Sequence, residues 1–234
     1  LVSDDGKKDL VFARTTHDQY GSYEMLSVVV NGKTYKDEIN YVYDFSVYLV
    51  HDDDKNYIYS DSWSDDDYHK ICALDINDAE IKQIAELSSV GFYGEFIEEE
   101  FEEGTVYQQV FNDPNHFTLE ARFEILGTRE GFANYMVSDE DGTPEMKDDA
   151  YNIEDGFEII SIVPLNVELT KDNTTMELPK GTVFYPLRSD GATYIDMKTE
   201  DGTEVRFNYD RLNYPWKVNG IPEDECFDNL LYAG

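Results

Sequence analysis

VFYPLRSDGATYIDMKTEDGTEVRFNY, residues 183–209, is the stretch that decides the fold. It holds three short runs of bulky apolar and β-branched residues, a composition typical of strands with one buried face. Asp-Gly pairs at 190–191 and 201–202 separate these runs. Asp-Gly between such runs is a strong short-range hairpin signal, so the stretch predicts three strands joined by two tight turns.

The residues just upstream extend this pattern. Leu165, Val167 and Leu169 alternate with polar residues, 171–173 reads as a turn, and a further apolar run reaches Leu178. Five short strands then lie within about 45 residues, from 165 to 209. Because closing a small sheet removes its exposed edges, this density of strands and turns predicts a small closed barrel.

The first half of the chain shows a looser form of the same pattern. A valine run at 28–30 meets Asn31-Gly32, the dipeptide preferred in tight hairpins, and YVYDFSVYLV at 41–50 has strand character. Residues 117–125 alternate cleanly, as in a half-buried strand. The segment 79–87 fits one face of a short helix or a strand returning after a turn, and both interpretations stay open.

Together these patterns predict a mostly β protein in two parts. Residues 1–150 are expected to form a propeller-like antiparallel strand meander that is too short to close a propeller, since each blade takes about 40–45 residues. Residues 151–234 are expected to form a small SH3-like β-barrel. The polar stretch at 139–149, which contains Gly and Pro, marks the predicted boundary.

Charge excludes several classes of partner. The 234 residues include 51 Asp and Glu against 18 Lys and Arg, a formal net charge of −33. The 18 Tyr and 13 Phe nevertheless supply enough bulky apolar surface for a folded chain. Nucleic acid and anionic lipid would be repelled, and the chain has no apolar stretch near the ~20 residues that a membrane span needs.

Three segments carry a family resemblance. LPKGTVFYPLRSDG (178–191), followed by KTEDGT (198–203), resembles bacterial SH3-like modules. WKVNGIPEDECF (216–227) is similar to the C-termini of uncharacterised exported proteins and lipoproteins of Gram-positive, often gut-dwelling, bacteria. SDDGKKDLVF (3–12) resembles the Asp-rich loop before a strand in FG-GAP or VCBS-type propeller repeats. The resemblance implies an extracellular or cell-surface protein, with any lipid anchor upstream of residue 1, and it implies no catalytic residue.

Acidic turns are the candidate metal ligands. Asp52 and Asp54 lie in one aspartate run, and Asp65 and Asp67 lie in another. Neither run has the Asp-x-Asp-x-Asp-Gly spacing of a calcium loop. We therefore expect solvated loops and no resident cofactor, with weak Ca²⁺ accumulation by charge alone as the alternative.

Aromatic residues in polar surroundings are the candidate ligand contacts. Trp63 falls in the polar segment 61–65, which reads as a loop, and Tyr93 falls in a Gly-Phe-Tyr-Gly turn. Tyr214 and Trp216 flank a proline. An aromatic ring offers an apolar face to a sugar or to an apolar side chain, so these four residues predict a surface that binds a glycan or a protein partner.

No catalytic motif is evident. The sequence has no Gly-x-Ser-x-Gly elbow and no His-x-x-x-His pair. The predicted function is therefore a non-enzymatic extracellular or cell-surface binding module. The alternatives are a polysaccharide hydrolase that uses paired carboxylates and a purely structural spacer. Sequence leaves the oligomeric state open, and also whether Cys72 and Cys226 form a disulfide.

Overall fold

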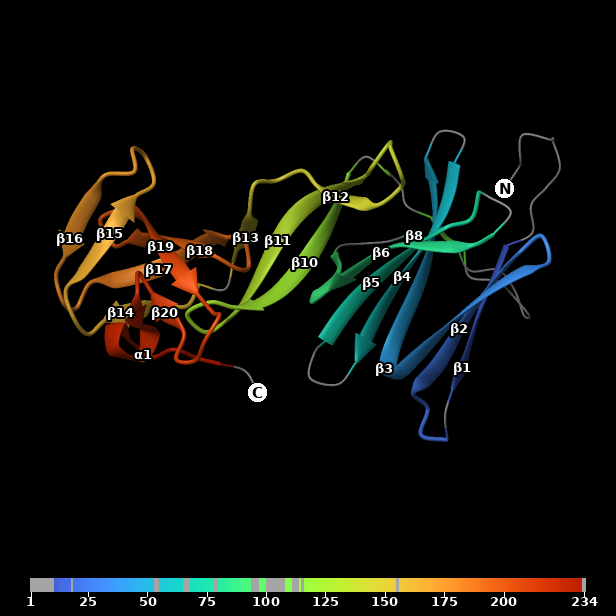
Figure 1. Cartoon of the computed structure of the whole chain (residues 1–234), viewed down its shortest axis with the longest axis horizontal. Helices are drawn as coiled ribbons and strands as arrows, with labels where there is room; N and C mark the ends of the chain where they lie inside the picture. Colours follow the sequence, from blue (N-terminus) through green and yellow to red (C-terminus); the bar gives the residue numbers. More distant parts are fainter. Residues whose placement is uncertain are drawn as a thin grey trace. The chain divides into compact units, whose positions relative to one another are not determined.

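The computed structural model describes residues 11–17, 19–52, 55–64, 68–77, 80–93, 97–99, 108–110, 114, 116–154 and 156–232 (Figure 1). Within these ranges the chain forms 22 strands and one four-residue helix, and nearly all strand pairs are antiparallel. The prediction of a mostly β, antiparallel protein is confirmed. The Asp-rich segment that resembles a propeller loop falls largely on residues 1–10, outside the described residues.

The chain folds into two compact units. Unit 1 comprises residues 1–119 and 134–147, and unit 2 comprises residues 120–133 and 148–234. The division falls inside two strands, β10 (Phe117–Glu124) and β11 (Thr128–Val137). The predicted domains 1–150 and 151–234 stay a prediction.

A six-stranded meander forms the main sheet of unit 1, in the order β1-β2-β3-β4-β5-β6. Its strands are β1 (Val11–His17), β2 (Tyr23–Val30), β3 (Lys33–Asp52), β4 (Lys55–Ser64), β5 (Tyr68–Asp75) and β6 (Lys82–Ser88). Two short strands extend the sheet: β9 (Gln108–Val110) runs parallel to β3, and β8 (Ile97–Glu99) pairs with β9. The remaining strands of unit 1 are β7 (Val90–Tyr93) and β12 (Pro144–Met146).

Strand β3 organises this sheet because it is 20 residues long. Its first half pairs with β2 and its second half pairs with β4, with a register shift between Val42 and Asp44. The predicted Asn31-Gly32 turn is confirmed: both residues have positive φ, as a two-residue hairpin requires. For the segment 79–87 the sequence allowed either a helix or a strand. The structure forms a strand there, β6, because its backbone pairs with β5.

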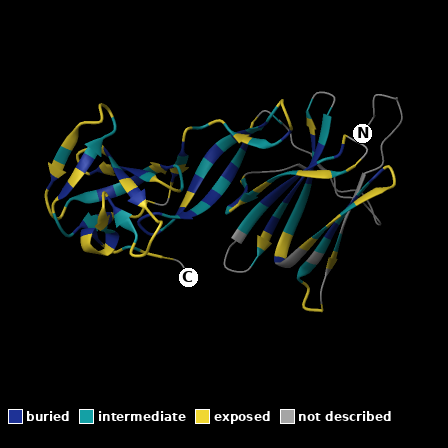
Figure 2. Cartoon of the chain, viewed as in Figure 1, coloured by how far each residue is buried: buried dark blue, intermediate teal, exposed yellow. Residues whose placement is uncertain are grey.

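Buried residues recur along the strands of unit 1 (Figure 2), and two groups of its described apolar side chains pack together. The aliphatic cluster joins residues of β2, β3, β4 and β5 and the residue after β5: Leu26, Val28, Val30, Val42, Ile58, Cys72, Leu74 and Ile76. The aromatic cluster consists of Tyr48, Tyr59, Phe92, Phe117 and Tyr135, whose neighbouring ring centroids lie 4.7–6.4 Å apart. Side chains of the same strands therefore enter different cores, as the two-residue alternation of a strand demands.

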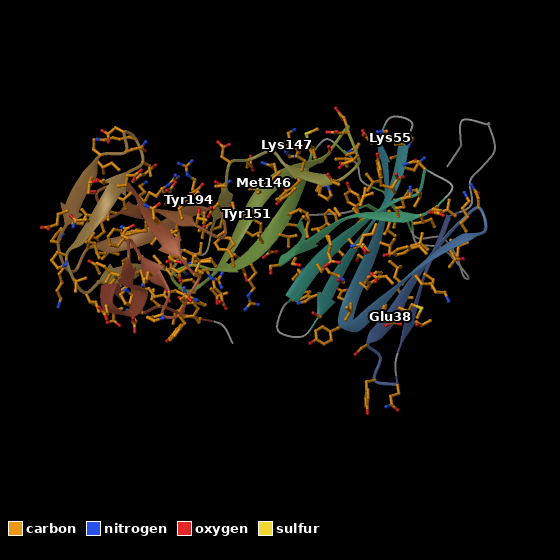
Figure 3. All side chains as sticks on the ribbon, in the orientation of Figure 1. Glu38, Lys55, Met146, Lys147, Tyr151 and Tyr194 are labelled. Atoms are coloured by element: carbon orange, nitrogen blue, oxygen red, sulfur yellow. The ribbon has the colours of Figure 1, made fainter. Side chains whose placement is uncertain are left out.

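A glycine turn packs onto the aromatic cluster. The Tyr59 hydroxyl donates to the Gly142 carbonyl at 2.6 Å, and a Cβ on Gly142 would overlap the buried ring of Tyr57. Gly142 also has φ +78°, a conformation that favours glycine. Nearby, Lys55, labelled in Figure 3, donates to the carbonyl of Asp139 at 3.0 Å.

Unit 2 contains the strands that the sequence predicted most clearly. In chain order its elements are β13 (Tyr151–Ile153), β14 (Ile159–Ser161), β15 (Leu165–Leu169), β16 (Thr175–Leu178), β17 (Val183–Ser189), β18 (Tyr194–Thr199), β19 (Glu204–Asp210), β20 (Lys217–Val218), β21 (Ile221–Pro222), α1 (Glu223–Cys226) and β22 (Phe227–Asp228). The five predicted strands correspond to β15–β19. They lie in the order β16-β15-β19-β18-β17, and β14 pairs with both β17 and β22.

Three phenylalanines from distant parts of the sequence form the centre of unit 2. The rings of Phe184, Phe207 and Phe227 meet edge to face with centroids 5.2–6.0 Å apart. Ile195, Met197 and Val205 pack fully buried in the same unit. The three strands predicted within residues 183–209 therefore contribute side chains to one apolar centre.

The two cysteines are buried and free, so they do not form a disulfide. Burial raises the pKa of the Cys72 thiol to about 12 and that of Cys226 to about 11. Both thiols are neutral at physiological pH and pack as small apolar side chains.

Candidate functional site

Large apolar side chains of unit 2 are exposed after β19. Leu212 is 89% exposed and Tyr214 is 86% exposed, while Trp216 is half-buried. Leu231 and Tyr232, near the end of the described chain, are also exposed. Single exposed apolar residues are common, but several large ones close together mark an interaction surface.

Contacts with the Trp216 ring join Arg211, Tyr214 and Tyr232 into one surface, and the exposed Leu212 and Leu231 are the chain neighbours of Arg211 and Tyr232. The Trp216 ring centroid lies 6.5 Å from that of Tyr214 and 5.6 Å from that of Tyr232, with interplanar angles of 77° and 61°. The Arg211 guanidinium lies over the Trp216 ring, 4.6 Å from its centroid, and its Nη2 lies 3.1 Å from Oε2 of Glu124. We call Arg211, Leu212, Tyr214, Trp216, Leu231 and Tyr232 the aromatic patch.

A buried carboxylate anchors the patch from below. The hydroxyls of Tyr209 and Tyr232 each donate to one oxygen of Glu223, both at 2.6 Å. Burial is the main cause that raises the pKa of both tyrosines, and the hydrogen bond to Glu223 is the second. Glu223 therefore has neutral phenol donors on both oxygens, which holds the Tyr232 ring beside Trp216.

The turn between β10 and β11 fixes the other end of the patch. The Thr128 amide donates to the Leu231 carbonyl at 2.8 Å. Gly127 has φ +105°, and a Cβ there would lie 2.7 Å from the same Leu231 oxygen. A glycine is required because the backbone of the C-terminal segment crosses the turn at van der Waals distance.

Of the four predicted aromatic contacts, Tyr214 and Trp216 come together in this patch, whereas Trp63 and Tyr93 belong to unit 1. The loop predicted around Trp63 is wrong, because residues 61–64 continue β4. The backbone ladder with β5 extends through this polar segment and sets Trp63 directly opposite His69. The two rings lie 4.6 Å apart, so Trp63 stacks on its own cross-strand neighbour.

The surroundings of Trp63 are polar. The Phe92 amide donates to Oδ2 of Asp61 at 3.0 Å, and Oδ1 of Asp61 lies 3.9 Å from Nδ1 of His69. Tyr93, on β7, is 52% exposed. Trp63 and Tyr93 are thus two of the exposed aromatic side chains of unit 1, each on a strand.

Among the predicted metal ligands only Asp52 lies within the described residues, at the end of β3 and opposite Lys55. Asp54, Asp65 and Asp67 lie outside them. Within the described part of the chain, no three His, Cys, Asp or Glu side chains converge as a metal centre would need.

A second buried carboxylate in unit 2 is neutralised by two arginines. Asp196 is 1% exposed; its Oδ2 accepts from Nε of Arg188 at 2.8 Å and from Nη2 of Arg206 at 2.9 Å, and its Oδ1 accepts from Nε of Arg206 at 2.7 Å. Arg206 also stacks 3.7 Å from the ring centroid of Tyr194, labelled in Figure 3. The three charged residues face one another across β17, β18 and β19. The group is a bidentate ion-pair network that joins these strands.

Sequence reasoning missed Arg211, Leu212, Leu231 and Tyr232 as members of the patch, along with Glu223, which anchors it. The exposure of Leu212 could have been predicted, because a leucine between Arg211 and Asn213 after the end of a strand belongs to no apolar pattern that would bury it. The other residues carried no such signal: Tyr232 lies 16 positions from Trp216, and only tertiary structure brings the two together.

Comparison of the chain with family models, curated proteins and solved structures found no match. In the described residues no helix is both long and apolar enough to cross a bilayer. The fold and the patch define a mostly β protein with one clustered aromatic surface.

Proposed function

We propose that this protein is a non-enzymatic binding module that presents the aromatic patch to a glycan or protein partner outside the cell. The observation that carries the proposal is the near-complete exposure of Leu212 and Tyr214 beside Trp216 and Arg211. Trp, Tyr and Arg are the residues that most often dominate binding energy at interfaces. Water contact with such large apolar groups is unfavourable, and a partner would relieve it.

The finer fold assignments belong to the same proposal. An SH3-like barrel over residues 151–234 is supported by the β17-β18-β19 meander, by β14 pairing with β17 and β22, and by the one-turn helix before β22. A propeller-like arrangement of residues 1–150 rests on the meander β1–β6 alone. The extracellular or cell-surface location rests on the sequence resemblance.

The hydrolase alternative is less well supported than binding. A glycosidase needs one protonated carboxyl and a second carboxylate across the bond. The deeply buried carboxylates of unit 2 are both engaged, Asp196 by two arginines and Glu223 by two tyrosines. Neither is free to face a substrate, and no observation favours the spacer over a binding module.

The test compares a patch variant with a matched surface variant. Tyr214→Ala removes an exposed ring from the patch, and Tyr43→Ala removes a half-exposed ring from β3 in unit 1. Both would be screened against soluble polysaccharides and a displayed peptide library, together with the unaltered protein. We expect at least one ligand whose Kd rises about tenfold or more with Tyr214→Ala, roughly 1.4 kcal/mol, and stays unchanged with Tyr43→Ala. Ligands indifferent to Tyr214 would refute the proposal.

A further inference from the structure

We infer that the partner of the aromatic patch is a polypeptide segment that carries aliphatic and cationic side chains. This inference rests on the proposed function and names the class of ligand for the same site. Ring geometry, the exposed leucines and the distribution of charge lead to it independently.

Ring geometry disfavours a sugar. A pyranose binds by laying its C–H face on an open, flat aromatic ring. Arg211 covers one face of Trp216, Trp216 is itself half-buried, and the Tyr214 and Tyr232 rings stand at 77° and 61° to it. The three rings therefore do not form one flat platform, and their steep angles suit side chains that insert between rings.

The leucines point the same way. Leu212 is 89% exposed and Leu231 is 58% exposed, so each has a large apolar area to bury. A hydroxyl-rich sugar ring would leave much of this area wet, or would lose hydrogen bonds to water on contact. Aliphatic side chains of a polypeptide bury it without that cost.

The acidic residues of this region favour a positively charged partner. Between residues 210 and 232 there are five acidic side chains and two basic ones. Asp210, Asp224, Glu225 and Asp228 are exposed, whereas the Arg211 guanidinium is already paired with Glu124. With a net charge of −33 the whole chain attracts cationic segments and repels a second copy of itself.

The probes are three short synthetic peptides of equal length. The first alternates Leu with Lys, the second replaces Leu by Ser, and the third replaces Lys by Glu. Binding would be followed at about 0.15 M salt, so that exposed charges beyond about 8 Å are screened. The full chain with Trp63→Phe leaves Trp216 as its one tryptophan, and its fluorescence reports contact at the patch.

We expect the Leu/Lys peptide to bind at least tenfold more tightly than either of the others, with a change in Trp216 fluorescence. Tyr214→Ala should remove that preference, and Tyr43→Ala should leave it intact. Equal binding of the Ser/Lys peptide would overturn the inference, because charge alone would then account for it. Equal effects of the two tyrosine variants would overturn it as well.

The outcome also separates this inference from the proposed function. If the Leu/Lys peptide shows no preference while a polysaccharide binds in a manner that depends on Tyr214, the ligand class is wrong and the binding module stands. If no probe and no library ligand depends on Tyr214, both fail.

Discussion

Unit 1 and unit 2 are stabilised in different ways. Unit 1 relies on packing: an aliphatic cluster and an aromatic cluster share its strands, and Tyr59 and Gly142 join a turn to the second cluster. Unit 2 also has an apolar centre, around three phenylalanines, and adds buried carboxylates held by ion pairs and phenol hydrogen bonds. The difference teaches that an acidic chain can place some of its carboxylates inside, provided that each has its own donors.

The two tryptophans reflect the same difference. Trp63 in unit 1 stacks on His69 across a regular strand pair, so its position follows from the sheet. Trp216 in unit 2 lies outside regular pairing, between an arginine and two tyrosines that belong to the proposed ligand surface. Since each unit has one tryptophan, Trp63→Phe and Trp216→Phe variants report on unit 2 and unit 1 separately.

The largest loss of stability is expected from a substitution that disrupts the packing of unit 1. Gly142→Ala places a methyl group against the buried Tyr57 ring and forces alanine into φ +78°. The left-handed backbone and the overpacking together should lower the free energy of unfolding by about 4 kcal/mol. Urea unfolding followed by Trp63 fluorescence measures this.

Gly32→Ala is the matched control for that change. Gly32 has a similar φ of +83°, and nothing lies within 4 Å of a Cβ at this position. Its cost should be about 1–2 kcal/mol, from the backbone alone. Equal costs for the two variants would mean that the contact between Gly142 and Tyr57 contributes nothing.

The second-largest loss of stability is expected from a substitution that removes the ion pairs of unit 2. Asp196→Asn removes the negative charge between Arg188 and Arg206 and leaves two like charges facing each other. We expect a loss of about 3 kcal/mol, at the low end for a buried pair because both arginines keep some solvent contact. Unfolding followed by Trp216 fluorescence is the measurement.

Asp61→Asn in unit 1 is the counterpart. Its side-chain oxygen can still accept the Phe92 amide hydrogen, so the expected loss is about 1 kcal/mol or less. If Asp61→Asn costs as much as Asp196→Asn, the contrast drawn between the two units is wrong.

The smallest effect is a difference in acid sensitivity. Threonine hydrogen bonds lower the pKa of Asp172 and Asp201 in unit 2 and of Asp141 in unit 1. Burial acts to raise the pKa of Asp190, and hydrogen bonds from Thr193 and neighbouring amides outweigh it, so this pKa is lowered too. Three of the four lowered values belong to unit 2.

A carboxyl whose pKa is lower in the folded state stabilises the fold above its unfolded pKa, here about 3.8. That stability is lost as the pH falls through the folded value. In an acid titration, Trp216 fluorescence should therefore change at a higher pH than Trp63 fluorescence. Coincident transitions would show that the two units respond to acid as one.

Local patterns predicted the strands and turns that depend on neighbours in the sequence. The alternation in residues 183–209 and the Asp-Gly turns gave β17, β18 and β19, and Asn31-Gly32 gave the β2–β3 hairpin. Periodicity could not decide the segment at 79–87, because apolar spacing fitted a helix and a strand equally well. Pairing with β5 decided it, since a strand satisfies its backbone through a partner and a helix through itself.

The candidate site was only half predictable for the same reason. Tyr214 and Trp216 are close in sequence and stood out as aromatic residues beside a proline. Tyr232, Glu223 and the turn at Gly127 joined them through contacts that no local pattern encodes. Trp63 stood out equally, and the structure gave it a cross-strand partner.

By itself, then, the sequence determined the class of secondary structure, the tight turns and the net negative charge. These follow from the steric preferences of single residues and from charge, which do not depend on tertiary contacts. Only the tertiary structure decided which carboxylates are buried, where Trp63 lies and which rings form the aromatic patch. Those outcomes depend on residues far apart in the chain, and burial and hydrogen bonding between them exist only once the strands have paired.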